Sequence, residues 1–252
     1  KDIAQIDRIV SRIAPNQVSD KGFRLAATQS SLPGVAVKNL FTDGRAWTTL
    51  LLWILFFMSF YLIWILLSWA PTLLRKSGAS VQQYSLAFAC INFGSALAII
   101  AVGRLMDRFD PFRTLKIANI LAAMSLVLFG WFAGSSFAVI SIVCVITGIF
   151  VFGSNSGVVA LCTVSYPLDI RATGIGWAYA IGKVGSLLAP VVGGFLLSRQ
   201  WSVAQICAVN ATVGVLIALV IVILQIHLAS VSLRDEAPET SEGRVAVPRT
   251  MP

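Results

Sequence analysis

Residues 46–70 read AWTTLLLWILFFMSFYLIWILLSWA, an apolar block that contains no charged residue. A helix needs about 20 apolar residues to cross the roughly 30 Å of hydrocarbon in a bilayer. The block is therefore long enough to span a membrane as one helix. Arg45 and Trp47 at its start are side chains that favour the membrane–water interface, and Ser68-Trp69-Ala70-Pro71 predicts its end at the opposite interface.

Five more apolar blocks follow, and none of the six contains Asp or Glu. The predicted spans are residues 46–70, 83–103, 114–134, 137–165, 173–197 and 203–227. The chain has 252 residues, of which 57% are hydrophobic and 12% are charged, whereas soluble domains carry about 25% charged residues. So few charges cannot cover a soluble fold of this size. We therefore predict an all-α integral membrane protein with six transmembrane helices.

The net charge of +8 is distributed unequally between the two sides of the membrane. Six spans place both termini on one side, which holds fifteen Lys and Arg: seven in 1–45, four in 104–116, Arg171 and three after 227. The other side holds three, Arg75, Lys76 and Arg199. Because loops rich in Lys and Arg stay on the cytoplasmic side of a membrane, both termini are expected to be cytoplasmic. No contiguous basic face remains once the loops are separated, which excludes nucleic acid as a partner.

Three regions are predicted. Residues 1–45 form a cytoplasmic linker that opens with an amphipathic helix at 1–14, residues 46–227 form the six-helix membrane domain, and residues 228–252 form a disordered cytoplasmic tail. The four cysteines lie in the apolar spans without a metal or disulfide spacing, so we expect them to act as small hydrophobic residues: Cys90, Cys144, Cys162 and Cys207. His227 has no partners for a metal, and no cofactor is expected.

Lys183 is the charged residue deepest inside a predicted span, since Lys116 lies at the edge of the span 114–134. If that span begins near residue 173, a rise of ~1.5 Å per residue places Lys183 about 15 Å deep, close to the bilayer midplane. An ionisable group at that depth indicates a functional site. Since the six spans offer no carboxylate, the lysine favours recognition of an anion, with Tyr179, Ser186 and Pro190 on the same helix face. The alternative is a purely structural lysine bound to backbone carbonyls.

An aromatic face follows the first span at helical spacing. It comprises Trp53, Phe57, Phe60, Tyr61 and Trp64. The functional hypothesis is a stacking wall for a planar ligand, to which Trp53, Phe57, Tyr61 and Trp64 contribute. The alternative is that these rings only face lipid or pack between helices.

A polar group interrupts the fourth span at Gly153-Ser154-Asn155-Ser156-Gly157. Asn155 is the best candidate for a hydrogen bond to a ligand, and Asn92 in the second span is a similar one, although either amide can simply bridge helices. The segment superficially matches G-x-S-x-G, but asparagine occupies the nucleophile position. No other catalytic motif occurs, so we predict that the chain is not an enzyme.

The loop Gly103-Arg104-Leu105-Met106-Asp107-Arg108 resembles the G-x-L-x-D-R-x-G-R loop signature of the major facilitator superfamily. The resemblance implies a gating loop at Gly103, Asp107, Arg108 and Arg113, in which Gly103 permits close helix contact and Asp107 and Arg108 form charge contacts. Asp110-Pro111 departs from the signature, where glycine and arginine are expected.

A second resemblance is more specific. The run 166–177, YPLDIRATGIGW, followed by Gly182-Lys183-Val184-Gly185 and Pro190-Val191-Val192-Gly193-Gly194, is similar to the aromatic acid:proton symporters of bacteria. Lys183 stands where that family has arginine, which keeps the charge but not the bidentate geometry. The resemblance implies the C-terminal half of a major facilitator fold, a 3+3 inverted repeat in the bacterial inner membrane, whose partner is a separate N-terminal six-helix half.

These observations predict half of a proton-coupled symporter that takes up small organic anions, such as aromatic carboxylates, by alternating access. Two alternatives stay open. One is a transporter of the same superfamily for sugars or other metabolites, and the other is a six-helix membrane protein that binds a partner without transport. We expect the chain to be a natural half or a fragment of a longer protein.

Overall fold

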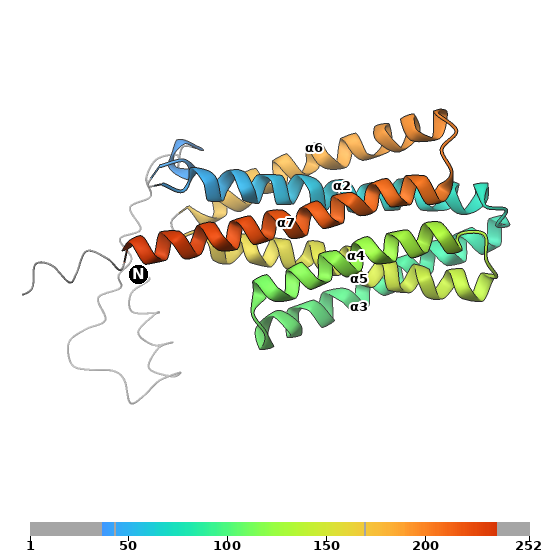
Figure 1. Ribbon diagram of the computed structural model, residues 1–252, viewed down its shortest axis with the longest axis horizontal. Coiled ribbons are helices and arrows are strands. Elements are labelled where there is room, and N and C mark those ends of the chain that lie inside the picture. Colours follow the sequence, from blue (N-terminus) through green and yellow to red (C-terminus); the bar gives the residue numbers. More distant parts are fainter. Residues whose placement is uncertain (1–36, 43, 169, 236–252) are drawn as a thin grey trace, which may run out of the picture. The chain divides into compact units, whose positions relative to one another are not determined.

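The computed structural model describes residues 37–42, 44–168 and 170–235, and within these ranges every regular element is a helix. The elements are η1 (Val37–Leu40), α2 (Ala46–Lys76), α3 (Val81–Arg108), α4 (Pro111–Phe132), α5 (Phe137–Ser165), α6 (Arg171–Ser198) and α7 (Val203–Asp235) (Figure 1). Six of these helices are long and apolar enough to cross a membrane. The prediction of an all-α chain with six spans is confirmed.

Several helices are longer than their apolar blocks. The predicted span 137–165 coincides with α5, but α2 continues past residue 70 to Lys76, and Pro71 lies inside it. The predicted end at Ser68-Trp69-Ala70-Pro71 is therefore wrong, since prolines are tolerated in transmembrane helices whose neighbours satisfy the freed carbonyl. Hydropathy marks the part of a helix that faces lipid, whereas the backbone hydrogen bonds of the helix continue beyond that part.

Short turns join the helices, and side chains cap the starts of α3 and α4. At the start of α3, the Ser80 amide donates to the Gln83 side chain at 2.9 Å while the Gln83 amide donates to the Ser80 hydroxyl at 3.3 Å. At the start of α4, the Asp110 carboxylate accepts from the Arg113 amide at 2.6 Å, and Pro111 is in the first turn. Asp110-Pro111, which departs from the family signature, is thus a helix start signal.

The bundle is built from three helix pairs. α2 packs chiefly on α6, α3 on α5, and α4 on α7, while α5 also contacts α2 and α4 (Figure 1). Backbones approach most closely between α3 and α5: a Cβ at Gly94 would collide with the Val145 carbonyl oxygen, and a Cβ at Gly148 with the Ile91 carbonyl oxygen. Inside a bilayer the hydrophobic effect does not drive helices together, so helices associate through close packing, which small residues allow.

The segment before α2 is fixed to the start of that helix. Leu40 is fully buried, and its carbonyl accepts a hydrogen bond from the Thr49 hydroxyl at 2.8 Å. The start of α6 is fixed in a similar way. The Arg171 guanidinium donates to the Tyr166 carbonyl at 3.1 Å, and Gly174 leaves room for the buried Tyr166 ring. These contacts hold the beginning of α6, the helix that carries Lys183.

Some predictions concern residues without a described structure. The amphipathic helix at 1–14 and most of the linker lie outside the described residues, as does the tail from 236 onwards. The predicted disorder of the tail is wrong for residues 228–235, because α7 continues to Asp235. The four cysteines are free, and three of them are buried, which agrees with their expected role as small hydrophobic residues.

Candidate functional site

Lys183 lies near the middle of α6. The helix has 28 residues and begins at Arg171, so a rise of ~1.5 Å per residue places Lys183 about 18 Å along its axis. The side chain is exposed on the described chain. Among the described residues, its ammonium makes no hydrogen bond or ion pair. A cation at this depth therefore lacks the carboxylate that would ordinarily balance it.

Aromatic rings of α2 hold this ammonium instead. The Lys183 Nζ lies 5.6 Å from the centroid of the Phe60 ring and 5.9 Å from that of Trp64. Both distances are within the roughly 6 Å over which a cation is attracted to the face of an aromatic ring. The cation is thus stabilised by two rings, of which Trp64 is exposed and could also stack on a planar molecule, and it keeps its hydrogen-bond donors available.

Tyr179 completes the group one turn before Lys183. Its ring meets Phe56 edge-on at 5.3 Å between centroids and Phe60 at 5.5 Å. We call Phe56, Phe60, Trp64, Tyr179 and Lys183 the lysine cluster. Tyr179 is 37% exposed, Trp64 is 39% exposed, and Lys183 is exposed, so three members of the cluster reach the surface of the described chain.

Two glycines on α6 bring the cluster together. A Cβ at Gly182 would lie 3.0 Å from the Phe60 ring, and a Cβ at Gly185 would collide with the Phe57 carbonyl oxygen. Larger side chains would push α6 away from α2 and would separate Lys183 from Phe60. The sequence Gly182-Lys183-Val184-Gly185 therefore sets the distance between the cation and the rings.

Asn155 lies on α5, which contacts α2. Its side-chain oxygen is buried and has no hydrogen-bond partner among the described residues. A buried acceptor without a partner costs free energy unless a ligand, water or another segment satisfies it. Asn92 differs, because its amide donates to the Phe88 carbonyl of its own helix at 2.9 Å and its side chain is exposed.

The aromatic face predicted on α2 is divided between two environments. Trp64 belongs to the lysine cluster, but the Tyr61 hydroxyl donates to the Asn210 side chain of α7 at 3.0 Å. Tyr61 therefore lies at the contact between α2 and α7. Phe60, a member of the predicted aromatic face, contacts both Lys183 and Tyr179. Phe56 is not a member of that predicted face, but it contacts Tyr179.

The other two rings of that face lie on another side of the contact between α2 and α6. Trp53 stacks on Trp177 at 6.1 Å between centroids. Phe57 and Trp53 line a separate cavity of 240 Å³ with Leu50, Ile54 and Ile181. The structure does not bring these two rings to Lys183.

The predicted gating loop spans the end of α3 and the start of α4. A Cβ at Gly103 would meet nothing within 4 Å, so the expected close helix contact there is wrong for the described residues. The guanidinium of Arg108 lies 6.0 Å from the Phe109 ring, and Arg113 is in the first turn of α4. The side chain of Asp107 is outside the described part of the structure, so its predicted charge contacts stay a prediction.

Comparisons with known proteins agree with this architecture. Residues 52–249 match the family model described as Major Facilitator Superfamily. The 4-hydroxybenzoate transporter PcaK of Pseudomonas putida is 33% identical over 223 residues, which cover 84% of this chain and 49% of that protein. The PcaK protein of Pseudomonas aeruginosa is 32% identical over 206 residues, or 80% of this chain and 45% of that protein.

A gallate transporter of Pseudomonas putida is 32% identical over 172 residues, which cover 68% of this chain and 37% of that protein. The chain spans about half the length of the curated relatives it matches. These relatives are named as transporters and not as enzymes, in line with the prediction drawn from the missing catalytic motifs.

Proposed function

Because this chain belongs to the major facilitator superfamily, we propose that it forms the C-terminal half of a transporter for small aromatic carboxylates. The observation that carries the proposal is Lys183, a cation near mid-membrane that faces aromatic rings and has no carboxylate partner among the described residues. The names of the relatives, which include 4-hydroxybenzoate, gallate and benzoate transporters, favour the same substrate class.

The lysine cluster supplies both kinds of contact that such a substrate needs. The ammonium attracts the carboxylate, and the exposed ring of Trp64 offers an apolar surface beside it. Asn155 would supply a hydrogen bond through its unpaired side-chain oxygen, which accepts from a substrate hydroxyl. Tyr179 is partly exposed in the lysine cluster. In this proposal the substrate binds between this half and an N-terminal half, and the two rock against each other to give alternating access.

The proposed transporter lies in the bacterial inner membrane with both termini in the cytoplasm, as the distribution of Lys and Arg predicts. Uptake is coupled to protons in this proposal. The six spans of this chain contain no Asp or Glu, so the proton-binding carboxylates would belong to the N-terminal half. Opening and closing would involve the loop at Gly103, Asp107, Arg108 and Arg113.

An uptake assay with the protein at its natural length tests the substrate class. Cells that express it are expected to accumulate labelled 4-hydroxybenzoate, and an excess of unlabelled benzoate is expected to reduce the uptake at least about fivefold, whereas an excess of glucose has no effect. A protonophore is expected to abolish accumulation. Competition by glucose and not by benzoate would favour the sugar alternative. The absence of any uptake by well-expressed protein would favour a non-transporting partner protein.

Trp64 is expected to contribute to substrate affinity through its exposed ring. Stacking on an aromatic ligand contributes about 0.5 to 1.5 kcal/mol beyond area burial, so Trp64→Ala is expected to raise the KM for uptake about fivefold. Trp64→Phe is expected to keep most of the affinity. Trp131→Ala is the matched control, because Trp131 is 77% exposed on α4 and outside the lysine cluster. Equal KM values for the two alanine variants would contradict the stacking role.

A further inference from the structure

A second cavity lies between α3, α4 and α5, away from the lysine cluster. Its volume is 520 Å³, and α2 and α6, which carry the cluster, contribute nothing to its lining. This volume is within the range of about 300 to 1,000 Å³ that is typical of ligand pockets. We call it the α3–α5 cavity. Most of its walls are apolar, and its lining includes Leu105, Phe109, Ile117, Leu121, Ile149 and Phe150.

The cavity is open to the outside of the bundle. Leu105 and Ile117, which lie in membrane-spanning helices, are each about half exposed, as is Phe109 in the turn between those helices. The apolar walls therefore continue onto the surface of the membrane-spanning part of the chain. In a bilayer this surface meets hydrocarbon. Leu121 lies eight residues after Arg113 on α4, which is about 12 Å deeper along the helix axis.

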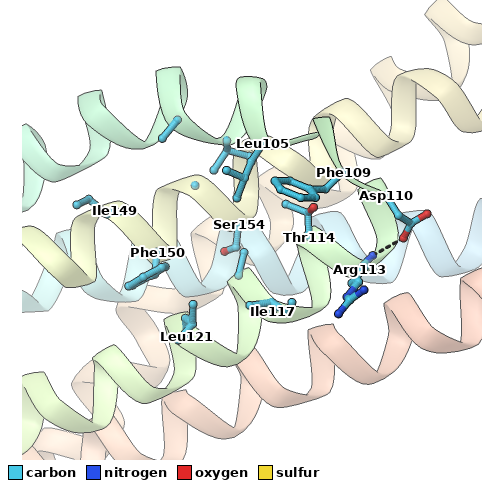
Figure 2. Close-up of a pocket in the computed structure, with 14 residues that line it drawn as sticks. Leu105, Phe109, Asp110, Arg113, Thr114, Ile117, Leu121, Ile149, Phe150 and Ser154 are labelled. Atoms are coloured by element: carbon cyan, nitrogen blue, oxygen red, sulfur yellow. Dashed lines mark hydrogen bonds between the residues drawn. The ribbon is translucent and has the colours of Figure 1, made fainter. Parts of the chain in front are cut away.

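Charge is confined to one end of the cavity. Figure 2 shows Asp110 and Arg113 at that end, and Phe150 and Leu121 at the other. The Asp110 carboxylate accepts the Arg113 amide and so caps α4, while the Arg113 side chain is exposed. A second cation, Arg108, lies over the Phe109 ring that lines the cavity. The apolar interior thus ends in two guanidinium groups where α4 enters the membrane.

We propose that the α3–α5 cavity binds one anionic phospholipid. An acyl chain fills the apolar interior, and the headgroup phosphate pairs with Arg113 and Arg108 at the mouth. Guanidinium groups bind phosphate well because their geometry allows two parallel hydrogen bonds. Basic pockets between transmembrane helices at the cytoplasmic surface have the chemistry that anionic headgroups require. A sugar or a free aromatic acid would leave most of the apolar walls uncovered.

Native mass spectrometry of the purified protein at its natural length tests the proposal, with phosphatidylglycerol or phosphatidylcholine added in detergent micelles. The wild-type protein is expected to retain one phosphatidylglycerol at least about tenfold more strongly than phosphatidylcholine. Arg113→Gln is expected to lower this preference at least about fivefold. Ala118→Phe, which fills the cavity with a ring, is expected to prevent retention of either lipid.

Arg199→Gln is the matched control, because Arg199 is also an exposed cation at a helix end, 5.2 Å from the Phe195 ring, but lies outside the cavity. It is expected to bind lipid as the wild type does. Equal retention of the two lipids by the wild type, or wild-type binding by both Arg113→Gln and Ala118→Phe, would overturn the proposal. If an Ile117→Cys variant crosslinks to another segment of the protein and no lipid is retained, the face is a protein contact and the proposal fails.

Discussion

Replacing Lys183 with methionine or alanine is expected to lower uptake of a labelled aromatic carboxylate at least about thirtyfold at low substrate concentration. Removal of one member of a charge pair that is shielded from water costs about 2 to 5 kcal/mol, and each 1.4 kcal/mol is tenfold in affinity. Methionine fills a similar volume without the charge, so the lost uptake reports the cation and not an empty space between α2 and α6.

Lys183→Arg is the conservative control. It keeps the charge, and the aromatic acid:proton symporters that this chain resembles carry arginine at this place, so the variant is expected to transport at a rate within a few-fold of the wild type. The amount of each variant in the membrane must be measured alongside, because Lys183 also contacts Phe60 and Trp64. Wild-type uptake by a well-expressed Lys183→Met variant would remove the lysine from the binding site.

A neutral analogue separates a binding role from a structural one. The amide of the same aromatic acid has the ring but not the negative charge, so it is expected to compete poorly for the wild-type protein. In Lys183→Met the acid and the amide are expected to compete about equally, since nothing remains to distinguish them. A lysine that only holds helices together would lower uptake without changing the ratio between the two competitors.

Most of the fold follows from hydropathy, because lipid permits only spanning elements that satisfy their own backbone hydrogen bonds. The apolar blocks therefore predict six spans and predict that each span is a helix. Hydropathy does not report where a helix stops, which explains why α2 extends through Pro71 to Lys76 and α7 to Asp235. It also does not report which helices are neighbours.

The candidate site was predictable only in part. Lys183 is evident as the charge deepest inside a span, but the aromatic face predicted on α2 is too wide. Trp53 and Tyr61 are eight residues apart, which turns them about 80° from each other around the helix. A helix with several neighbours presents such a broad face to more than one of them. Tyr61 consequently meets Asn210 of α7 rather than Lys183.

Two signals could have improved the prediction. Phe56 and Phe60 are one turn apart and precede Trp64 by another turn, so the three rings share one face, which fits Gly182 and Lys183 on α6. Asn210 is an amide inside an apolar span, and such a group needs a hydrogen-bond partner on a neighbouring helix. Which helix provides that partner depends on tertiary packing, so the sequence alone could not assign Tyr61 to it.

The second large effect is expected at the contact between α3 and α5. Gly94→Ala adds one methyl group that would collide with the Val145 carbonyl oxygen, and backbone cannot move aside as the end of a side chain can. Overpacking of this kind costs about 1 to 3 kcal/mol. We expect a loss of about 2 kcal/mol, which lowers the melting temperature of the purified protein by roughly 4 to 8 °C.

Gly103→Ala on the same helix is the control, since a Cβ there would meet nothing within 4 Å. Alanine favours a helix over glycine by about 1 kcal/mol at both positions, so this gain cancels in the comparison, and only Gly94→Ala is expected to melt earlier. Gly148→Ala tests the reciprocal contact with Ile91 and is expected to behave like Gly94→Ala. If Gly94→Ala and Gly103→Ala melt at the same temperature, α3 and α5 do not approach as closely as their glycines indicate.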